Sequence, residues 1–141
     1  MRGLRSCLVA LALAGALSLP ACDTPDPSGG DVDVLAPTDP RLAMAVADVD
    51  PMTGEVRSWA TAPLDGEDDA WIAYPGNIQL DISHGLGRAP NGVLVYLAFT
   101  PDGRFPALAA GDLARIIEVD ASHVVVANGT NGDYFARVVV F

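Results

Sequence analysis

The chain contains no lysine and only two histidines among its 141 residues. Its two cysteines are Cys7 and Cys22, so the chain after Cys22 has no thiol pair with which to form an internal disulfide. Aromatic residues make up only 6%, and the Gly-x-Ser-x-Gly, phosphate-loop and His-Glu-x-x-His patterns are all missing. With so few nucleophiles, bases and metal ligands, the sequence predicts a protein that is not an enzyme and that uses no metal ion or cofactor.

Negative charge dominates the chain and is unevenly distributed. All 18 acidic residues follow Cys22, whereas two of the eight arginines, Arg2 and Arg5, precede it. From Cys22 onward, six arginines stand against 18 acidic residues, which gives a side-chain charge of −12. A surface this acidic repels phosphate backbones. The charge balance therefore argues against nucleic-acid binding and disfavours flat adhesion to an anionic membrane.

The first 21 residues have the pattern of a secretory signal peptide. Arg2 and Arg5 form a positive region, and the run from Cys7 to Leu19 is apolar except for glycine and serine. That run is shorter than the about 20 apolar residues that a membrane-spanning helix needs. No later stretch approaches this length, so the sequence predicts no transmembrane helix after the signal peptide.

The signal peptide ends in Leu19-Pro20-Ala21-Cys22. This segment resembles the lipobox of bacterial lipoprotein precursors, in which a leucine, a variable residue and a small residue precede a cysteine. Pro20 departs from the serine, alanine or threonine that is more usual there. The resemblance implies cleavage before Cys22, a diacylglyceryl group on its thiol and an acyl chain on its new amino group, and two or three such chains anchor a protein durably. The alternative is an ordinary secretory signal with an unmodified Cys22.

A lipid on Cys22 makes the membrane itself a partner and places the protein in the bacterial cell envelope. The outer membrane, the periplasmic face of the inner membrane and the cell surface all stay open as locations. Asp23 resembles the enteric signal for retention in the inner membrane, a rule that does not hold in every bacterial group. The sequence identifies no protein or glycan partner.

Composition divides the rest of the chain into a tether and a domain. Residues 22–40 comprise the lipidated cysteine and a segment rich in aspartate, proline, glycine and serine. Such a segment buries too little apolar surface to offset its ordering entropy, and its 18 residues after Cys22 reach on the order of 50 Å when extended. We therefore expect residues 23–40 to form an extended tether and residues 41–141 to form one domain.

Residues 41–141 show short strands separated by turns. Ile78, Leu80 and Ile82 alternate with polar residues, which is the period of a half-buried strand, and residues 92–100 are apolar on both faces. We expect a helical turn or loop at 107–113. The expected strands cover residues 42–49, 56–62, 71–74, 78–83, 92–100, 115–120, 123–127 and 134–141. Seven or eight short strands with frequent turns predict an all-β protein with an antiparallel β-sandwich.

The segment from His84 to Pro90, HGLGRAP, is the most distinctive part of the domain. Its glycines permit backbone conformations that other residues avoid, and Pro90 stiffens the exit. The segment resembles the His-x-Leu-Gly-x-x-Pro turn of small β-domains in phage tail fibres and related exported bacterial proteins. That resemblance covers roughly residues 71–141, implies a β-sandwich used in attachment or assembly, and carries over no catalytic residue. His84 and Arg88 are candidate binding residues, with the shaping of a tight connection as the plainer alternative.

Aromatic residues are the candidates for a carbohydrate- or peptide-binding face. Trp71 and Tyr74, the two ends of an expected short strand that leads to Pro75-Gly76, are the candidate binding residues of this set. Packing within the sheets is the plainer role for every aromatic in this set. The remaining members of the set are Trp59, Tyr96 and Tyr134.

Three further segments invite chemical interpretations. Residues 48–55 resemble a calcium loop only in part, because the fifth position is Met52 and the glycine comes one place late, so we expect a hairpin turn. The acidic run at 65–69 is expected to be a solvated loop. Ser122 and His123 are adjacent, and because neighbouring strand residues point to opposite faces we expect no catalytic dyad.

These observations favour a lipid-anchored envelope protein whose β-sandwich is a non-catalytic binding or structural module. A carbohydrate- or surface-ligand-binding module is the second hypothesis, and an exposed row of aromatic side chains would support it. A small metal-dependent hydrolase is the third, and it would require His84 and His123 to converge with a carboxylate around a cavity.

Overall fold

The computed structural model describes residues 30–64 and 69–141. The signal peptide, Cys22, residues 23–29 and most of the acidic run at 65–69 lie outside the described residues. Within the part that is described, no helix is long and apolar enough to cross a membrane.

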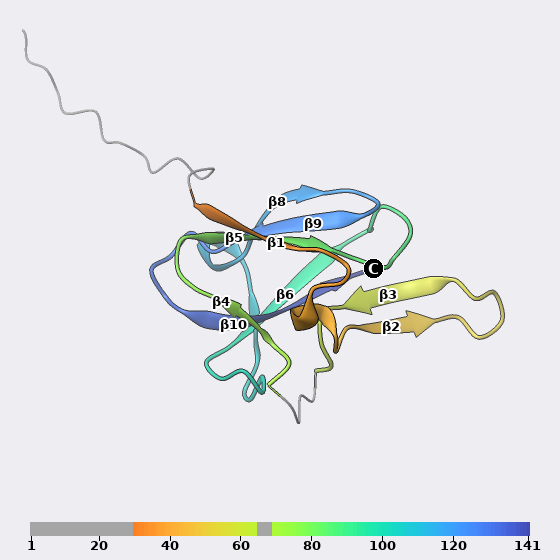
Figure 1. Ribbon diagram of the computed structural model, residues 1–141, viewed down its shortest axis with the longest axis horizontal. Coiled ribbons are helices and arrows are strands. Elements are labelled where there is room, and N and C mark those ends of the chain that lie inside the picture. The colour runs from red at the N-terminus through yellow and green to blue at the C-terminus, as the bar shows by residue number, and fades with distance from the viewer. Residues whose placement is uncertain (1–29, 65–68) are drawn as a thin grey trace, which may run out of the picture.

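In the described residues, ten strands form two sheets that pack face to face, as predicted for an all-β sandwich (Figure 1). The four-stranded sheet has the order β1 (Asp31–Leu35), β5 (Ile78–Ser83), β9 (His123–Ala127), β8 (Arg115–Val119). The other sheet has the order β2 (Val46–Val49), β3 (Val56–Ala60), β10 (Tyr134–Val140), β6 (Val93–Ala98), β7 (Ala107–Ala109), and β4 (Ile72–Tyr74) also pairs with β10. Short 3-10 helices, η1 (Pro40–Leu42) and η2 (Gly111–Leu113), connect the two sheets.

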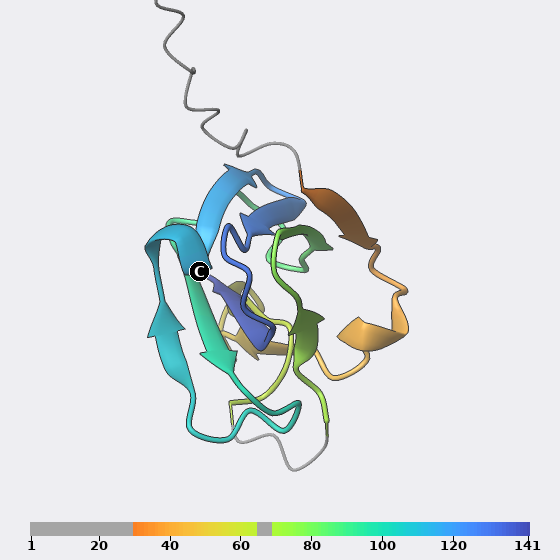
Figure 2. The same ribbon diagram turned by 90° about the vertical axis from the view of Figure 1, so that its left-hand side faces the viewer.

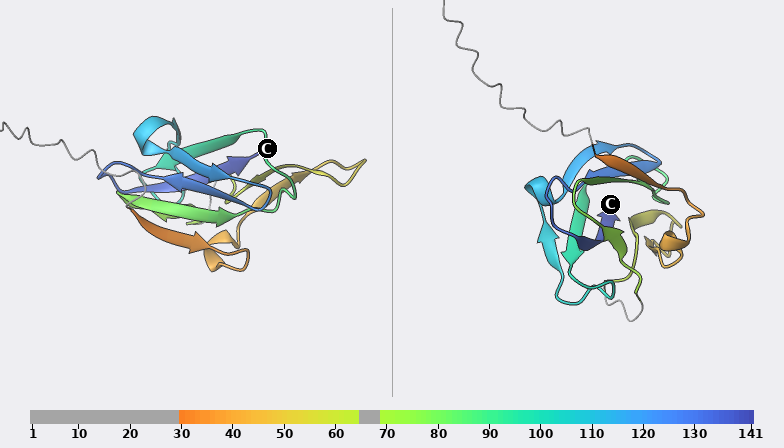
Figure 3. Two further views of the ribbon diagram at one scale, coloured as in Figure 1. Left: turned by 90° about the horizontal axis from the view of Figure 1, so that it is seen from above. Right: turned by 60° about the vertical axis from the view of Figure 1, so that its left-hand side comes forward.

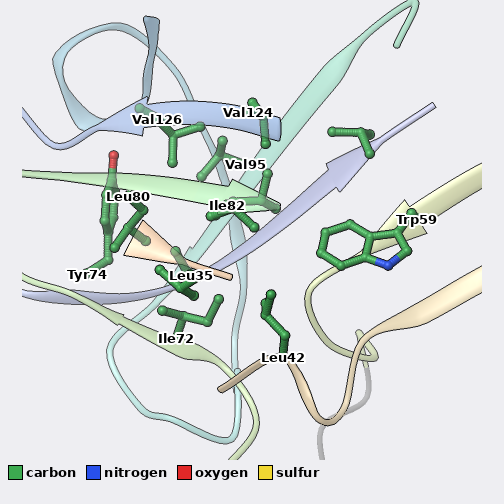
Figure 4. Close-up of a cluster of buried hydrophobic side chains, with 14 of the residues drawn as sticks. Leu35, Leu42, Trp59, Ile72, Tyr74, Leu80, Ile82, Val95, Val124 and Val126 are labelled. Carbon is green, nitrogen blue, oxygen red and sulfur yellow. The ribbon is translucent and has the colours of Figure 1, made fainter. Parts of the chain in front are cut away.

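The core lies between the sheets and follows the period-two pattern of the sequence. Leu80 and Ile82 of β5 are fully buried, and so are Val138 and Val140 of β10 on the opposite sheet. Figure 4 shows these layers meeting around Leu35. Each fully buried aliphatic side chain of this kind stabilises the fold by about 1.5–3 kcal/mol relative to leaving it exposed.

Strand β6 is apolar on both faces because both faces are covered. Val95 and Leu97 point into the core between the sheets. On the outer face, Ala98 packs against Ala62 and Trp71, which form a second, smaller apolar cluster. Ala62 and Trp71 therefore cover the outer side of the larger sheet at the end of β6.

The predicted tether does not extend as far as residue 40. Residues 31–35 form β1, which pairs in parallel with β5 from Asp31 opposite Ile78 to Leu35 opposite Ile82. Leu35 is fully buried, so this short strand adds apolar surface to the core despite its polar surroundings. Arg41 forms ion pairs with Asp33 and Asp39 and so fastens the end of the strand to η1. The folded domain begins near Gly30 rather than at Arg41, and one strand pair is parallel.

The eight expected strands are all present, and β1 and β7 are additional. The segment 107–113, expected to be a helical turn or a loop, forms the three-residue strand β7 and then η2. Strand β7 is too short to show a period in the sequence, and it is defined by its pairing with β6.

The two ends of the sandwich differ in which chain segments they carry. The start of β1 and the start of β5 lie at one end, which faces the viewer in Figure 2. The β2–β3 hairpin and the C-terminus lie toward the other end, as Figure 3 shows from above. The loop 128–133 joins the end of β9 to the start of β10, and β10 begins where β6 ends. The end of β6 lies beside the start of β10, and the loop that follows β6 is at the bottom of Figure 2, whereas β1 begins at the top.

Candidate functional site

The predicted His84 turn forms at the end of β5, and its histidine is only 9% exposed. The backbone amide of Leu86 donates to Nδ1 of His84 at 3.3 Å, and Nε2 lies 3.2 Å from the carbonyl oxygen of Asp120. An imidazole that accepts at Nδ1 and donates at Nε2 is neutral. Burial lowers the pKa of His84, while the hydrogen bond and charge of Asp120 act in the opposite direction. Nδ1 therefore shapes the turn that contains His84, and Nε2 joins the end of β5 to the β8–β9 turn.

The glycines of this turn have a structural role. Gly87 has a φ of +73°, which disfavours any residue with a side chain. A Cβ at Gly85 would lie 3.3 Å from the indole of Trp59, so the turn packs closely on that ring. Leu86 is buried between the two glycines. The sequence pattern thus builds a tight connection with one apolar anchor.

The structure does not bring Arg88 and His84 to a common cavity. His84, Trp59 and Leu42 line a pocket of about 240 Å³, and Arg88 is not among its lining residues. The Arg88 side chain is exposed and makes a long hydrogen bond, 3.5 Å, to the carbonyl oxygen of Ala89. The two candidate binding residues of this turn therefore do not form a joint site in the described part of the chain.

Ser122 and His123 come together, contrary to expectation, because Ser122 lies in the β8–β9 turn rather than within a strand. Ser122 Oγ is 3.3 Å from His123 Nδ1, and the same nitrogen is 3.0 Å from Asp120 Oδ2. A catalytic triad needs serine and aspartate on opposite nitrogens of the imidazole. Here both face Nδ1, and Ser122 Oγ also donates to Asp120 Oδ1 at 2.9 Å. The three side chains cap a turn and do not activate the serine.

The Asp120 carboxylate holds the β8–β9 turn together through its hydrogen bonds. It accepts hydrogen bonds from the backbone amides of Ser122 at 2.6 Å and of His123 at 2.9 Å. These bonds to the charged form lower the pKa of Asp120 to about 2. His84 and His123 both contact Asp120, but His84 does so through the backbone carbonyl. In the described ranges no three histidine, cysteine or acidic residues are grouped so that they could hold a metal ion.

The loop at 48–55 is a hairpin turn, as predicted. Asp50 accepts hydrogen bonds from the backbone amides of Met52 at 2.7 Å and Thr53 at 3.2 Å, and it pairs with Arg57 at 2.5 Å. These bonds lower the pKa of the Asp50 carboxyl, with the Met52 amide as the largest cause. Gly54 closes the turn at a φ of +75°. The carboxylate is therefore committed to shaping the turn.

Trp71 and Tyr74 lie in the interior rather than on a binding surface. Trp71 is buried between the outer face of the larger sheet and the 101–103 turn, and its Nε1 donates to the carbonyl oxygen of Pro63 at 3.2 Å. Tyr74 is fully buried in the main core (Figure 4). Its hydroxyl has no hydrogen-bond partner among the described residues, and burial raises its pKa. Neither residue presents a ring face to a ligand, because each fills the space between layers.

The other aromatic candidates also pack within the fold. Trp59 is buried beside His84, with the two ring centroids 6.3 Å apart. Tyr96 is half-buried beneath Arg137, whose guanidinium carbon lies 5.6 Å from the ring centroid. Burial lowers the pKa of Arg137 and the Tyr96 contact partly offsets it. The predicted aromatic set therefore forms no exposed row.

Two phenylalanines that the sequence did not single out are the most exposed aromatic residues of the described chain. Phe99 is 83% and Phe105 is 95% exposed, and Leu108 nearby is 60% exposed. They border a largely apolar groove of about 220 Å³, whose other lining residues are Leu97, Ala98, Ala107, Ala109, Leu113 and Tyr134. We call these three exposed side chains and their groove the apolar end. Large apolar side chains gathered in this way on a surface are typical of contact sites.

The loop that carries the two phenylalanines is held in a defined shape. Asp102 accepts a hydrogen bond from Thr100 Oγ1 at 2.5 Å and pairs with Arg104 at 2.7 Å. The Thr100 hydrogen bond is the main cause that lowers the pKa of the Asp102 carboxyl. Phe105 has a φ of +55°, an unfavourable conformation for a bulky residue. A fully exposed aromatic ring held in a strained conformation gains nothing from local packing, so the observation points to a contact made elsewhere.

The sequence contains a signal for this exposed pair of phenylalanines. Phe99 ends a strand that is apolar on both faces, and Phe105 follows the Pro101-Asp102-Gly103 turn only a few residues later. The composition of this turn predicts the end of a strand, and the local pattern places Phe99 in that strand and Phe105 in the loop after it. Their exposure depends on packing between distant parts of the chain, which the local pattern does not contain.

Comparison with protein-family models, with curated proteins and with solved structures finds no match to this chain.

Proposed function

We propose that this chain is a lipid-anchored protein of the bacterial cell envelope and that its β-sandwich is a non-catalytic binding module. The observation that carries the anchor is the order of features before the domain: Arg2 and Arg5, the apolar run and the lipobox-like Leu19-Pro20-Ala21-Cys22. Two or more acyl chains on one cysteine give durable membrane attachment without a transmembrane helix. The strongly acidic domain needs such an anchor because its charge does not favour adhesion to anionic lipid.

The binding role is supported by a difference between the polar residues of the His84 and Asp120 turns, which are engaged within the fold, and the apolar end, which is exposed. The polar groups around His84 and Asp120 are engaged in hydrogen bonds that hold the fold together. Phe99 and Phe105, in contrast, are exposed on a loop whose shape is fixed by Asp102. Apolar side chains presented on a rigid loop suit contact with another apolar surface.

The two alternative functions have less support. A carbohydrate-binding module would need polar groups to hold sugar hydroxyls beside an aromatic platform, whereas the groove beside Phe99 is lined mainly by apolar side chains. A metal-dependent hydrolase would need free histidine nitrogens, whereas both ring nitrogens of His84 have backbone partners. We therefore rank these functions second and third.

Substitution of each cysteine tests the anchor. Cys22→Ser is expected to abolish labelling by radioactive palmitate and to move the protein from the membrane fraction to the soluble fraction. Cys7→Ser is the matched control, since it lies within the segment that would be removed, and it should leave both labelling and fractionation unchanged. Continued lipid labelling of Cys22→Ser, or a membrane-bound Cys22→Ser protein, would contradict the proposal.

A further inference from the structure

The turn that follows β5 has few backbone contacts. Just beyond the end of β5, the amide of His84 donates to the carbonyl oxygen of Ser122 at 2.9 Å. The next backbone–backbone hydrogen bond along the chain joins the amide of Asn91 to the carbonyl oxygen of Phe141 at 2.5 Å. Within the part of the chain that the structure describes, residues 85–90 therefore form no backbone–backbone hydrogen bond. Segments of this kind open locally at a lower free energy than core strands do.

A side-chain hydrogen bond closes this turn. The backbone amide of Leu86 donates to Nδ1 of His84 at 3.3 Å. Leu86 itself is buried, and Gly85 packs on the indole of Trp59. Gly87, with a φ of +73°, allows the chain to leave in a new direction. The closed turn therefore depends on this hydrogen bond and on two packing contacts, and only the hydrogen bond responds to a proton.

The two ring nitrogens of His84 have fixed roles in the closed turn. A backbone amide can only donate, so Nδ1 has to accept and carries no proton. The proton of the neutral ring is then on Nε2, which donates to the carbonyl oxygen of Asp120 at 3.2 Å. A second proton would go to Nδ1, where it would face the Leu86 amide with two donors and no acceptor. Protonation of His84 therefore removes the bond that closes the turn and keeps the bond to Asp120.

The charged and titratable groups that act on His84 within the described chain are Asp120 and His123. Asp120 favours the charged ring and His123 opposes it, while burial is the largest effect and lowers the pKa of His84. Backbone amides lower the pKa of Asp120 to about 2, so its charge stays constant while a histidine titrates. The pocket beside His84 is otherwise lined by residues that do not titrate: Pro37, Leu42, Ala45, Trp59, Ser83 and Gly85. The closed turn therefore binds a proton less well than a solvated, open one.

We propose that the turn from His84 to Pro90 is an acid-sensitive switch, in which a proton on Nδ1 of His84 displaces Leu86 and uncovers Trp59 while the two sheets stay folded. Gly85 is part of the wall of the pocket of about 240 Å³ beside Trp59, so opening of the turn widens that pocket. One proton is linked to opening, and an open turn has the ordinary histidine pKa of about 6.5. The ratio of open to closed turns therefore rises by up to about 25-fold between pH 7 and pH 5. The switch depends on the folded domain and not on the lipid anchor.

Hydrogen exchange measured by NMR on the isotope-labelled full-length protein in detergent micelles tests the switch. The protection factor of the Leu86 amide, corrected for the intrinsic pH dependence of exchange, reports the open fraction of the turn. The Asn128 amide, which donates to the carbonyl oxygen of Ile78 at 2.9 Å, is the control for global unfolding. The variants are His84→Gln, which does not titrate, and His123→Gln, which removes the other histidine of the described chain. The nitrogen shifts of the His84 imidazole at pH 7 are measured on the parent protein.

From pH 7 to pH 5, Leu86 is expected to lose protection by about 10- to 25-fold and Asn128 by less than about threefold. His123→Gln should behave like the parent protein, whereas in His84→Gln the protection of Leu86 should change by less than about twofold. A Leu86 protection factor that stays constant in the parent protein would overturn the switch, and so would an equal loss at Asn128, which would mean global unfolding. The same loss in His84→Gln, or its absence in His123→Gln, would also overturn it. Imidazole shifts that place the proton on Nδ1 at pH 7 would overturn it without any variant.

Discussion

Nε2 of His84 lies 3.2 Å from the carbonyl oxygen of Asp120, a residue 36 positions later in the chain. This contact joins the end of β5 to the β8–β9 turn and commits the histidine to its neutral form, because Nδ1 already accepts the Leu86 amide. The pKa of His84 is lowered by burial, so the folded protein favours the uncharged ring. The most distinctive sequence motif of the domain therefore has a structural role, because it connects β5 to the β8–β9 turn.

The first prediction concerns the pH dependence of stability. A histidine whose pKa is lowered on folding contributes stability that is present above its unfolded pKa of about 6.5 and is lost as the pH falls below that value. Urea unfolding should show a decrease in the free energy of unfolding between pH 7 and pH 5. In His84→Gln, which keeps a donor toward Asp120 but does not titrate, this decrease should be smaller. An equal decrease in the variant would assign the pH dependence to other groups.

The second prediction concerns the hydroxyl of Tyr74, which is buried without a partner among the described residues. Tyr74→Phe removes an unsatisfied polar group and keeps the ring, so the free energy of unfolding should stay the same or rise by up to about 2 kcal/mol. Tyr74→Ala removes the ring as well and should lower it by about 3–5 kcal/mol. A loss of more than about 1 kcal/mol in Tyr74→Phe, measured by urea unfolding, would show that the hydroxyl has a partner after all.

The third prediction compares two glycines with nearly equal backbone angles. Gly103 has a φ of +69° and Gly54 a φ of +75°, but a Cβ at Gly103 would lie 2.3 Å from the indole of Trp71, whereas nothing lies near Gly54. Gly54→Ala should cost about 1–2 kcal/mol of unfolding free energy from backbone strain alone. Gly103→Ala should cost about 1–3 kcal/mol more, because Trp71 must shift. Equal losses in the two thermal or urea unfolding curves would mean that Trp71 does not pack on this turn.

The fourth prediction tests where the domain begins. Leu35 is fully buried at the end of β1, while Val32 on the same strand is 56% exposed. Leu35→Ala should lower the free energy of unfolding by about 2–5 kcal/mol. Val32→Ala, the matched control, should change it by no more than about 0.5 kcal/mol. If Leu35→Ala were as mild as its control in urea unfolding, residues 31–35 would belong to the tether that their composition suggests.

The difference between β5 and β1 shows what the sequence pattern can predict. Strand β5 was predictable because Ile78, Leu80 and Ile82 alternate with polar residues, and the alternation matches one buried face. Strand β1 has a similar alternation in DVDVL, but its aspartates and the prolines around it have the composition of an unfolded segment. Its stability comes from parallel pairing with β5, more than 40 residues away, and no local pattern contains that contact.

The same limit applies to the candidate site. The turn at His84 follows from its glycines and proline, which constrain the backbone locally. Trp71 and Tyr74 are ordinary aromatic residues in sequence, and their burial depends on packing between distant parts of the chain. Phe99 and Phe105 are exposed, and nothing in their local pattern distinguishes them from buried strand and loop residues. Local patterns predict the turns and strands, and long-range packing decides which aromatic rings stay outside.

Lipid anchoring is tested by the intact mass of the protein purified from membranes of the cells that make it, together with fragmentation of its N-terminal peptide. We predict a chain whose first residue is Cys22, carrying the mass of a diacylglyceryl group on sulphur. A chain that retains residues before Cys22, or that begins at an unmodified cysteine, would contradict lipid anchoring.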